Sequence, residues 1–293
     1  MRIIVGADGS PSALNAVRTA TVEAARRGGH LRIVHAFLWP LMHVPLGPSP
    51  SGPPTGGLRH EAERILAEAA ETAAATDPAV KVETELVTGF PAQVLLAEAA
   101  TAELVVIGDR GLGAVAEMVI GSVALQVAER SPVPVLVVKG RTRGSGPVLI
   151  GLDGSPASSR ALRVAFDAAA LRGVDLVAAH VRAEAVVFDA TPASLYERDA
   201  TWTQREWPFT AALDRERRRK PTVVATDEVM VGDAGEAIVA RARHAQLIVV
   251  GAHGRTGFFG RVLGSVSRHV LRHAPCPVLI VPPPLTDEKG TAR

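Results

Sequence analysis

The stretch Leu104-Val105-Val106-Ile107-Gly108-Asp109-Arg110-Gly111 joins an apolar run to a glycine loop, which Gly121-Ser122 closes after nine further residues. The pattern returns in Leu247-Ile248-Val249-Val250-Gly251-Ala252-His253-Gly254, followed after nine residues by Gly264-Ser265. Each apolar run predicts a buried strand, and a helical pattern follows each Gly-Ser pair. A glycine loop between a strand and a helix N-terminus allows backbone amides to bind phosphate. Two copies at one internal spacing therefore predict two phosphate sites, with plain turn geometry as the alternative.

The repetition extends over both halves of the chain. Residues Ile3–Pro11 correspond to Val148–Pro156, 145 residues later, and His35 corresponds to His180 at the same spacing. In the later part of each half the spacing is 143 residues. A repeat of this length is a whole domain, because solenoid units are far shorter. We predict an N-terminal domain over 1–141 and a C-terminal domain over 146–293, joined by a polar, glycine-bearing linker over 140–147.

Composition narrows the class of protein. The 32 basic and 30 acidic residues of the 293 nearly cancel, so no global field points to nucleic acid. Cys276, the only cysteine, rules out an intramolecular disulfide and suits a reducing compartment. The chain enters a predicted strand at once, without a signal peptide, and no uncharged apolar run reaches about 18 residues. We therefore expect a cytoplasmic protein with no membrane and no nucleic-acid partner.

Strand and helix patterns alternate in both halves, with a helix predicted over Ser10–Arg27 and a second-half helix near Ser194–Lys220. The basic run Arg215–Lys220 is interpreted as the solvated end of that helix, with a partner-binding patch as the alternative. Alternating βα units with uninterrupted apolar strands predict a parallel sheet covered on both faces. The predicted fold class is α/β: two doubly wound parallel five-stranded sheets in tandem, each of order 3-2-1-4-5.

One aspartate follows the first strand of each predicted sheet. Asp8 and Asp153 stand in Asp-Gly-Ser-Pro turns, where a carboxylate can simply stabilise the start of a helix. In the 3-2-1-4-5 order they also lie at the switch point where such sheets bind ligands, which favours contact with a base or ribose. His35 and His180 are interpreted as hydrogen-bonded histidines at the rim of the core, since no second His or Cys stands at metal-ligand spacing. We predict no metal site of the protein's own.

The pattern G-x2-G-x9-G-[ST], with V-G-x-D-G-S at the first strand and a closing P-V-x-V-V strand, resembles the universal stress protein family. Both halves match, so the whole chain resembles a tandem-domain member. The resemblance implies a Rossmann-like fold of the adenine-nucleotide α-hydrolase-like group, with ATP in each crevice and any Mg²⁺ carried by that ATP. It also implies a pseudo-dimer in which the domains pair through their last strands, and it leaves pairing between two chains open.

The resemblance assigns nucleotide contacts to corresponding residues of the two halves. In the first half these are Gly6, Asp8, Ala36, Gly108, Arg110, Gly111, Gly113, Gly121, Ser122 and Val123. In the second half they are Gly151, Asp153, Val181, Gly251, His253, Gly254, Arg255, Gly257, Gly264, Ser265 and Val266.

Two further expectations come from the residues themselves. The last apolar strands, 133–138 and 278–281, are bracketed by prolines and would be bare edges unless they pair with each other. The second loop carries Arg255 and Arg261 where the first has Leu112 and Met118, which predicts tighter nucleotide binding at the second site.

The function that the family resemblance implies is that of an ATP-binding, nucleotide-dependent stress-response regulator with no catalytic residues assigned. The chain has no G-x-x-x-x-G-K-[ST] motif, and neither loop contains a lysine. The alternatives are a slow ATPase or nucleotidyl-transfer enzyme using Asp8 or Asp153, and an assembly protein with vestigial pockets.

Overall fold

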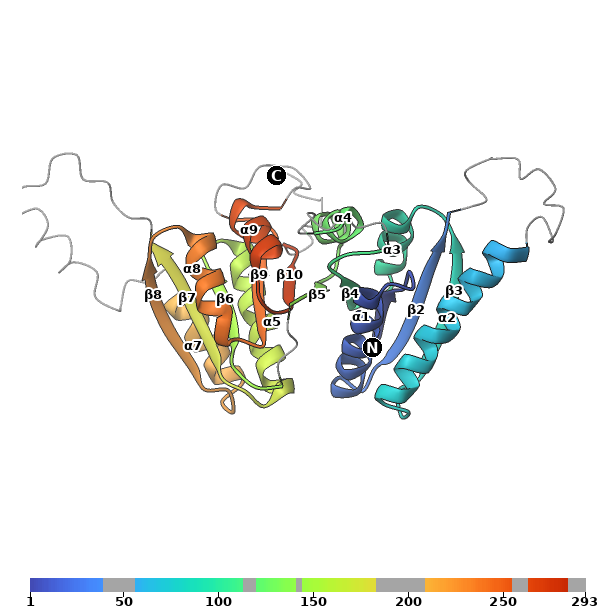
Figure 1. Cartoon of the computed structure of the whole chain (residues 1–293). Helices are drawn as coiled ribbons and strands as arrows, with labels where there is room; N and C mark the ends of the chain where they lie inside the picture. The colour runs from blue at the N-terminus through green and yellow to red at the C-terminus, as the bar shows by residue number, and fades with distance from the viewer. Residues whose placement is uncertain (39–55, 113–119, 141–143, 183–208, 255–262, 284–293) are drawn as a thin grey trace, which may run out of the picture.

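The computed structural model of the chain describes residues 1–38, 56–112, 120–140, 144–182, 209–254 and 263–283. They form one ten-stranded sheet in the order β3-β2-β1-β4-β5-β10-β9-β6-β7-β8, flanked by helices (Figure 1). Each half contributes five parallel strands in the order 3-2-1-4-5. The fold class predicted from the sequence is confirmed.

The first half alternates strand and helix. Its strands are β1 (Arg2–Gly6), β2 (His30–Phe37), β3 (Val82–Thr88), β4 (Leu104–Gly108) and β5 (Val135–Val138). Its helices are α1 (Pro11–Arg26), α2 (Gly56–Thr76), α3 (Pro91–Ala99) and α4 (Ser122–Arg130).

The second half repeats this order. Its strands are β6 (Val148–Leu152), β7 (Leu176–Arg182), β8 (Ala225–Val231), β9 (Leu247–Gly251) and β10 (Val278–Val281). Its helices are α5 (Pro156–Arg172), α7 (Thr210–Arg219), α8 (Ala234–Arg241), the short 3₁₀ turn Ala242–His244 and α9 (Ser265–His273). Of the helix predicted near 194–220, the part before residue 209 lies outside the described residues.

Two apolar layers hold the helices to the sheet. Side chains of α1, α2, α5 and α7 pack on one face, and those of α3, α4, α8 and α9 pack on the other. Both layers run through the two halves without a break. The innermost strands are therefore covered on both sides, and every residue of β4, β5 and β10 is buried.

The Asp-Gly-Ser-Pro turns start the first helix of each half in the same way. Gly9 has φ +80°, a conformation that favours glycine, and Ser10 Oγ accepts a 3.1 Å hydrogen bond from the backbone N–H of Ala13. Ser155 receives the equivalent bond from Ser158, also at 3.1 Å. The cap of each helix is thus the serine, and the aspartate before it is available for other contacts.

The last strands of the two halves join the sheets. β5 and β10 pair antiparallel, with Leu136 opposite Leu279. These two leucines occupy corresponding positions of the repeat, so the axis that relates the halves passes through this pair. The neighbouring pairs, Val135 with Ile280 and Val137 with Val278, exchange under the same axis. Pairing removes two apolar edges that would otherwise be exposed, as the proline-bracketed strands suggested.

One lysine of the first half reaches across this junction. Lys139 is 7% exposed, and its ammonium donates to the carbonyl oxygens of Leu271 at 2.8 Å and Arg272 at 2.6 Å. These carbonyls end α9, where a cation complements the helix dipole. Burial lowers the pKa of Lys139 to about 8, although the nearby Asp109 carboxylate opposes this.

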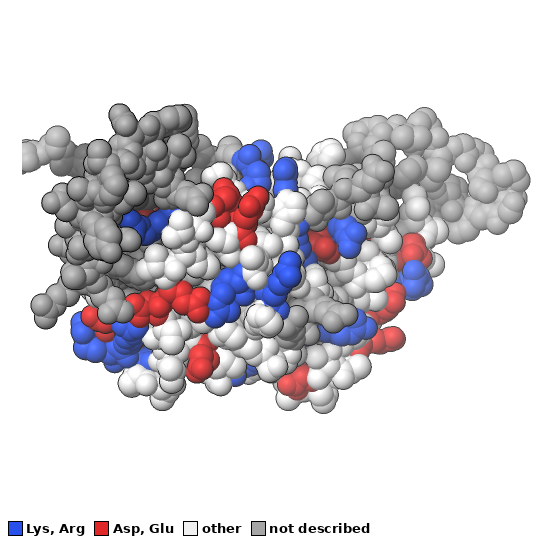
Figure 2. All heavy atoms as spheres, turned by 60° about the vertical axis from the view of Figure 1, so that its left-hand side comes forward, with Lys and Arg blue, Asp and Glu red and all other residues white. Residues whose placement is uncertain are grey.

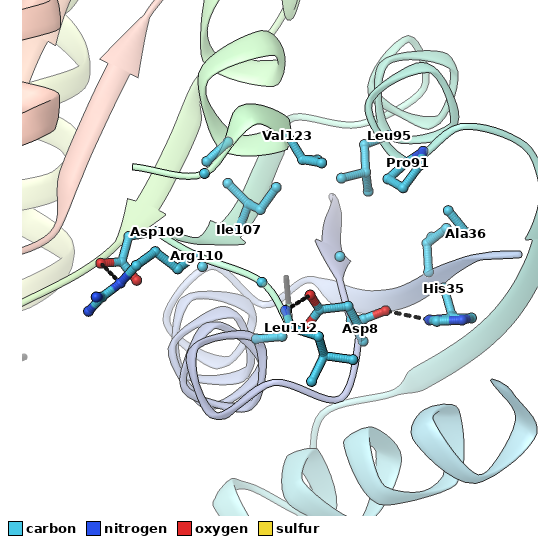
Figure 3. A pocket seen from close by; sticks show the side chains of 18 of the residues that line it. Asp8, His35, Ala36, Pro91, Leu95, Ile107, Asp109, Arg110, Leu112 and Val123 are labelled. Carbon is cyan, nitrogen blue, oxygen red and sulfur yellow. Dashed lines mark hydrogen bonds and ion pairs between the residues drawn. The ribbon is translucent and has the colours of Figure 1, made fainter. Parts of the chain in front are cut away.

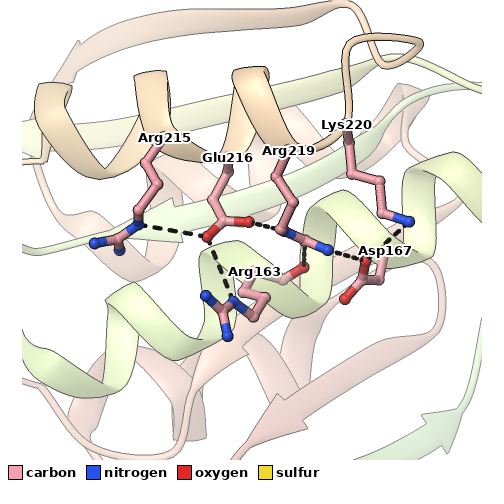
Figure 4. Close-up of polar contacts among 6 residues, drawn as sticks. All are labelled: Arg163, Asp167, Arg215, Glu216, Arg219 and Lys220. Atoms are coloured by element: carbon pink, nitrogen blue, oxygen red, sulfur yellow. Dashed lines mark hydrogen bonds and ion pairs between the residues drawn. The ribbon is translucent and has the colours of Figure 1, made fainter.

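The basic run on α7 lies beside acidic partners. Glu216, 1% exposed, accepts from Arg219 and forms a 3.5 Å ion pair with Arg163 (Figure 4). Asp167 of α5 pairs with Arg219 at 2.7 Å and with Lys220 at 3.6 Å. On the face seen in Figure 2, basic and acidic side chains are interspersed rather than separated by sign. This arrangement agrees with a solvated helix end that also packs against its neighbour α5.

Among the described residues, no helix is long and apolar enough to cross a membrane.

We predict that the free energy of unfolding rises between about pH 8 and pH 10.5, the folded and ordinary pKa values of Lys139. In that interval the folded protein loses a proton that the unfolded chain still binds, so stability increases with pH. Lys139 contributes about 3 kcal/mol to this rise in the free energy of unfolding, because each unit of pKa difference corresponds to 1.36 kcal/mol. Urea unfolding at several pH values should show it, and Lys139→Met should remove it. Parallel pH curves for the two proteins would contradict the assignment.

Candidate nucleotide-binding site

A cavity of about 440 Å³ lies at the carboxyl ends of β1, β2 and β4 in the first half. It is the crevice at which the strand order reverses, where open α/β sheets bind ligands. One wall is apolar and the other is polar (Figure 3). The apolar wall consists of Val34, Ala36, Ile65, Pro91, Leu95 and Ile107. The polar wall consists of Asp8, the glycine loop 108–112 and Ser122.

Asp8 connects the two loops that border the cavity. Its Oδ1 accepts from the backbone N–H of Ser10 at 3.0 Å, and its Oδ2 accepts from that of Leu112 at 3.1 Å. A Cβ on Gly111 would lie 2.4 Å from Asp8 Oδ2, so this approach requires glycine. Asp8 therefore stabilises its own turn and also lines the cavity, and its contact with a base or ribose stays a prediction.

The start of α4 faces the same cavity without a side-chain cap. Its N-cap residue is Gly121, and no side chain among the described residues caps the helix. Ser122, Val123 and Ala124, the first residues of α4, all line the cavity. The first N–H groups of a helix have no partner within the helix and attract anions. α3 likewise begins without a side-chain cap, after Phe90, whereas Ser10 caps α1.

His35 and the charged pair of the loop have structural partners. His35 Nδ1 donates to the carbonyl oxygen of Ala7 at 2.7 Å, since a carbonyl can only accept. Asp109 accepts from Ser12 Oγ at 2.7 Å and lies 3.5 Å from Arg110 Nε. In Figure 3 the side chains of Asp109 and Arg110 lie together on the far side of the loop from His35. Neither charge of this pair is directed into the centre of the cavity.

The second half has a corresponding but smaller cavity of about 120 Å³. It is lined by Asp153, the glycines 251, 254 and 264, and the first residues of α9. Asp153 Oδ1 accepts from the backbone N–H of Ser155 at 3.0 Å, as Asp8 does in the first half. α9 also begins after a glycine, Gly264, without a side-chain cap among the described residues.

Two differences narrow the second cavity at its apolar end. Val181 stands where the first half has the smaller Ala36. The side chain of Ile238 lies close to β6, because a Cβ on Gly151 would be 2.7 Å from its Cδ1, against 3.1 Å for Leu95 and Gly6.

The structure brings the sequence-predicted residues of each half to one cavity, as far as they are described. The first cavity is lined by Gly6, Asp8, Ala36, Gly108, Arg110, Gly111, Gly121, Ser122 and Val123. The second is lined by Gly151, Asp153, Val181, Gly251, His253, Gly254, Gly264, Ser265 and Val266. Gly113, Arg255 and Gly257 lie outside the described residues, as does Arg261. Their role in nucleotide binding stays a prediction.

Sequence reasoning missed most of the apolar wall. Ile65 on α2 and Pro91 and Leu95 on α3 line the first cavity, yet they read as ordinary core positions of helices. The repeat carried a signal that could have found two of them, because Pro91 corresponds to Ala234 and Leu95 corresponds to Ile238. Ala234 and Ile238 line the second cavity. Helix starts that follow a strand at this edge of the sheet are therefore candidates for a ligand wall.

The comparisons with known proteins agree with the fold and with the repeat in the sequence. The model of the universal stress protein family matches twice, over residues 1–139 and 145–282. A universal stress protein of Mycolicibacterium smegmatis is 34% identical over 292 residues, covering 96% of this chain and 97% of its own. One of Mycobacterium tuberculosis is 34% identical over 293 residues, covering 95% and 96%.

A solved structure shows the same fold. The crystal structure of a universal stress protein from Archaeoglobus fulgidus superposes with a TM-score of 0.69 at 20% identity, covering 96% of this chain and 98% of that one. The double match of the family model and the near full-length relatives lead to one conclusion. The chain belongs to the universal stress protein family and has its tandem-domain form.

Proposed function

We propose that the chain is a nucleotide-dependent stress-response regulator that binds an adenine nucleotide, ATP in the first instance, at the carboxyl edge of each half. The observation that carries this proposal is the uncapped start of α4, which opens into a cavity that has an apolar wall on its other side. A nucleotide has the matching division, with an apolar base at one end and phosphates at the other.

The apolar wall suits the base. Ala36, Leu95 and Ile107 leave room for a planar ring between β2, α3 and β4. The volume of about 440 Å³ lies within the roughly 300–1,000 Å³ that is usual for small-molecule sites. Asp8 belongs to the polar wall, where a ribose would lie beside the base, and its carboxylate can accept hydrogen bonds from the ribose hydroxyl groups.

The glycine loop and α4 suit the phosphates. Gly111 brings the backbone close to Asp8, and Gly121 starts α4 without a side chain. A phosphate at this place would take the free N–H groups of the first turn and the Ser122 hydroxyl. Any Mg²⁺ in this proposal arrives with the nucleotide. Among the described residues, no group of three or more His, Cys, Asp or Glu side chains could hold a metal ion.

We also propose that the first site binds the nucleotide more tightly than the second. The described residues enclose about 440 Å³ in the first cavity and about 120 Å³ in the second. The opposite order, predicted from Arg255 and Arg261, rests on residues outside the described part of the chain. A charge near a helix terminus is worth about 0.3–1 kcal/mol, and we give more weight to the contacts that a base makes in a fitted cavity.

Replacing both loop-closing glycines should abolish binding. A valine at Gly121 and at Gly264 would place methyl groups where the phosphates lie, at positions where a Cβ already comes within 3.3 Å and 3.4 Å of backbone atoms. Calorimetric titration with ATP should show saturable binding to the wild type and none to the double variant. Gly144→Val is the matched control, because a Cβ there meets nothing within 4 Å. Unchanged affinity in the double variant would refute the site.

The single variants measure each site in the full chain. Gly264→Val leaves the first site intact, and Gly121→Val leaves the second. We expect ATP to bind at least about tenfold more tightly to Gly264→Val, a difference of about 1.4 kcal/mol. Equal affinities, or tighter binding to Gly121→Val, would show that loop charge outweighs cavity volume. If bound ATP is converted to ADP in a single-turnover experiment, the result would instead favour the slow ATPase over the regulator.

A further inference from the structure

The contacts between the two halves are symmetric in the backbone but not in the side chains. β5 and β10 pair about an axis through Leu136 and Leu279. Three polar contacts of side chains cross this junction among the described residues near the axis, and the first half supplies the acid in two of them. These contacts are Glu23 with Arg172, Glu129 with Arg268, and Lys139 with the last carbonyls of α9.

The buried contact is the ion pair of Glu23 on α1 with Arg172 on α5. The two side chains are 2% and 7% exposed, and Arg172 also donates to the carbonyl oxygen of Ala168 at 3.1 Å. Glu23 has further cations in its own half, Arg26 and Arg27, both at 3.2 Å. Within the described residues, Glu23 is the carboxylate paired with Arg172. The second half thus depends on the first for the partner of a buried charge.

The repeat does not restore this pair in the other direction. The position that corresponds to Glu23 is Ala168, and the position that corresponds to Arg172 is Arg27. If two C-terminal halves paired about the same axis, each Arg172 would meet Ala168 of the other copy. Two guanidinium groups would then be buried without a carboxylate, which is strongly unfavourable. If two N-terminal halves paired instead, Glu23 of each copy would meet Arg27 of the other. These buried charges therefore do not disfavour that arrangement.

The other two contacts also disfavour the pairing of two C-terminal halves. Arg268 lies 4.0 Å from Glu129, and the residue that corresponds to Glu129 is Arg272, so paired C-terminal halves would bring like charges together. The residue that corresponds to Lys139 is Pro282, which has no ammonium to donate to a helix end. Neither of these contacts can form between two C-terminal halves.

We propose that this interface selects unlike halves: the C-terminal half accepts an N-terminal half as its partner and rejects a second C-terminal half. The partner is thus defined chemically as a β5 edge flanked by a buried carboxylate on α1. Within one chain, the linker keeps the N-terminal half next to the C-terminal half, so the two halves of one chain form the interface. This inference does not depend on nucleotide binding.

The test uses the full chain with a protease site in the linker at 141–143. The folded protein is cut, unfolded in urea, and refolded with both halves present, and native mass spectrometry counts the pairs. We expect N–C pairs to exceed C–C pairs at least about 100-fold, because a buried charge without its partner costs several kcal/mol. C–C pairs near the quarter share of random pairing would overturn the proposal.

Two variants assign the selectivity to Arg172. Arg172→Met removes the charge that rejects a second C-terminal half, and Ala168→Glu supplies the carboxylate that such a pair lacks. Either change should raise the C–C share at least about tenfold, whereas the exposed Arg218→Met should leave it unchanged. Circular dichroism of the uncut chains checks that each variant folds. If both folded variants still form N–C pairs alone, Arg172 does not carry the selectivity and the proposal fails.

Discussion

The antiparallel pairing of β5 with β10 is the interaction on which the rest of the molecule depends. Each half alone would end its sheet in a four-residue strand whose side chains are all buried here. Pairing converts two such edges into the centre of one sheet and lets the apolar layers continue from half to half. The strands left at the outer edges are β3 and β8, whose residues are intermediate or exposed.

The same strand order that makes this junction also makes the cavities. With β1 and β4 adjacent, the Asp8 turn and the glycine loop leave the sheet side by side, and a backbone N–H of one loop reaches the carboxylate of the other. The second half repeats the strand order and the turn but not the volume, because Val181 and Ile238 occupy more space. A duplicated fold therefore holds two cavities that differ at their apolar ends, while each keeps an aspartate and a helix start without a side-chain cap.

The sequence predicted the fold well because its signals are local and occur twice. Apolar runs such as 104–107, glycines at fixed spacing and Asp-Gly-Ser-Pro turns each specify a short piece of backbone, and the repeat confirms each piece independently. Asp8, Gly111 and Gly121 were found from the same signals. The apolar wall was not, because Ile65 and Leu95 belong to helices whose apolar faces look alike whether they cover a core or a ligand. Volume also has no sequence signal, since it depends on how several side chains pack together.

The central claim is that the first cavity holds an adenine base, and photolabelling with 8-azido-ATP tests it most directly. The azide is attached to the base, so the label reports where the base lies. Peptide mass spectrometry should find the label on residues of β2, α2 or α3 that line the cavity, such as Ala36, Ile65 or Leu95, and excess ATP should prevent it. Labelling elsewhere on the surface, or labelling that ATP does not displace, would contradict the account.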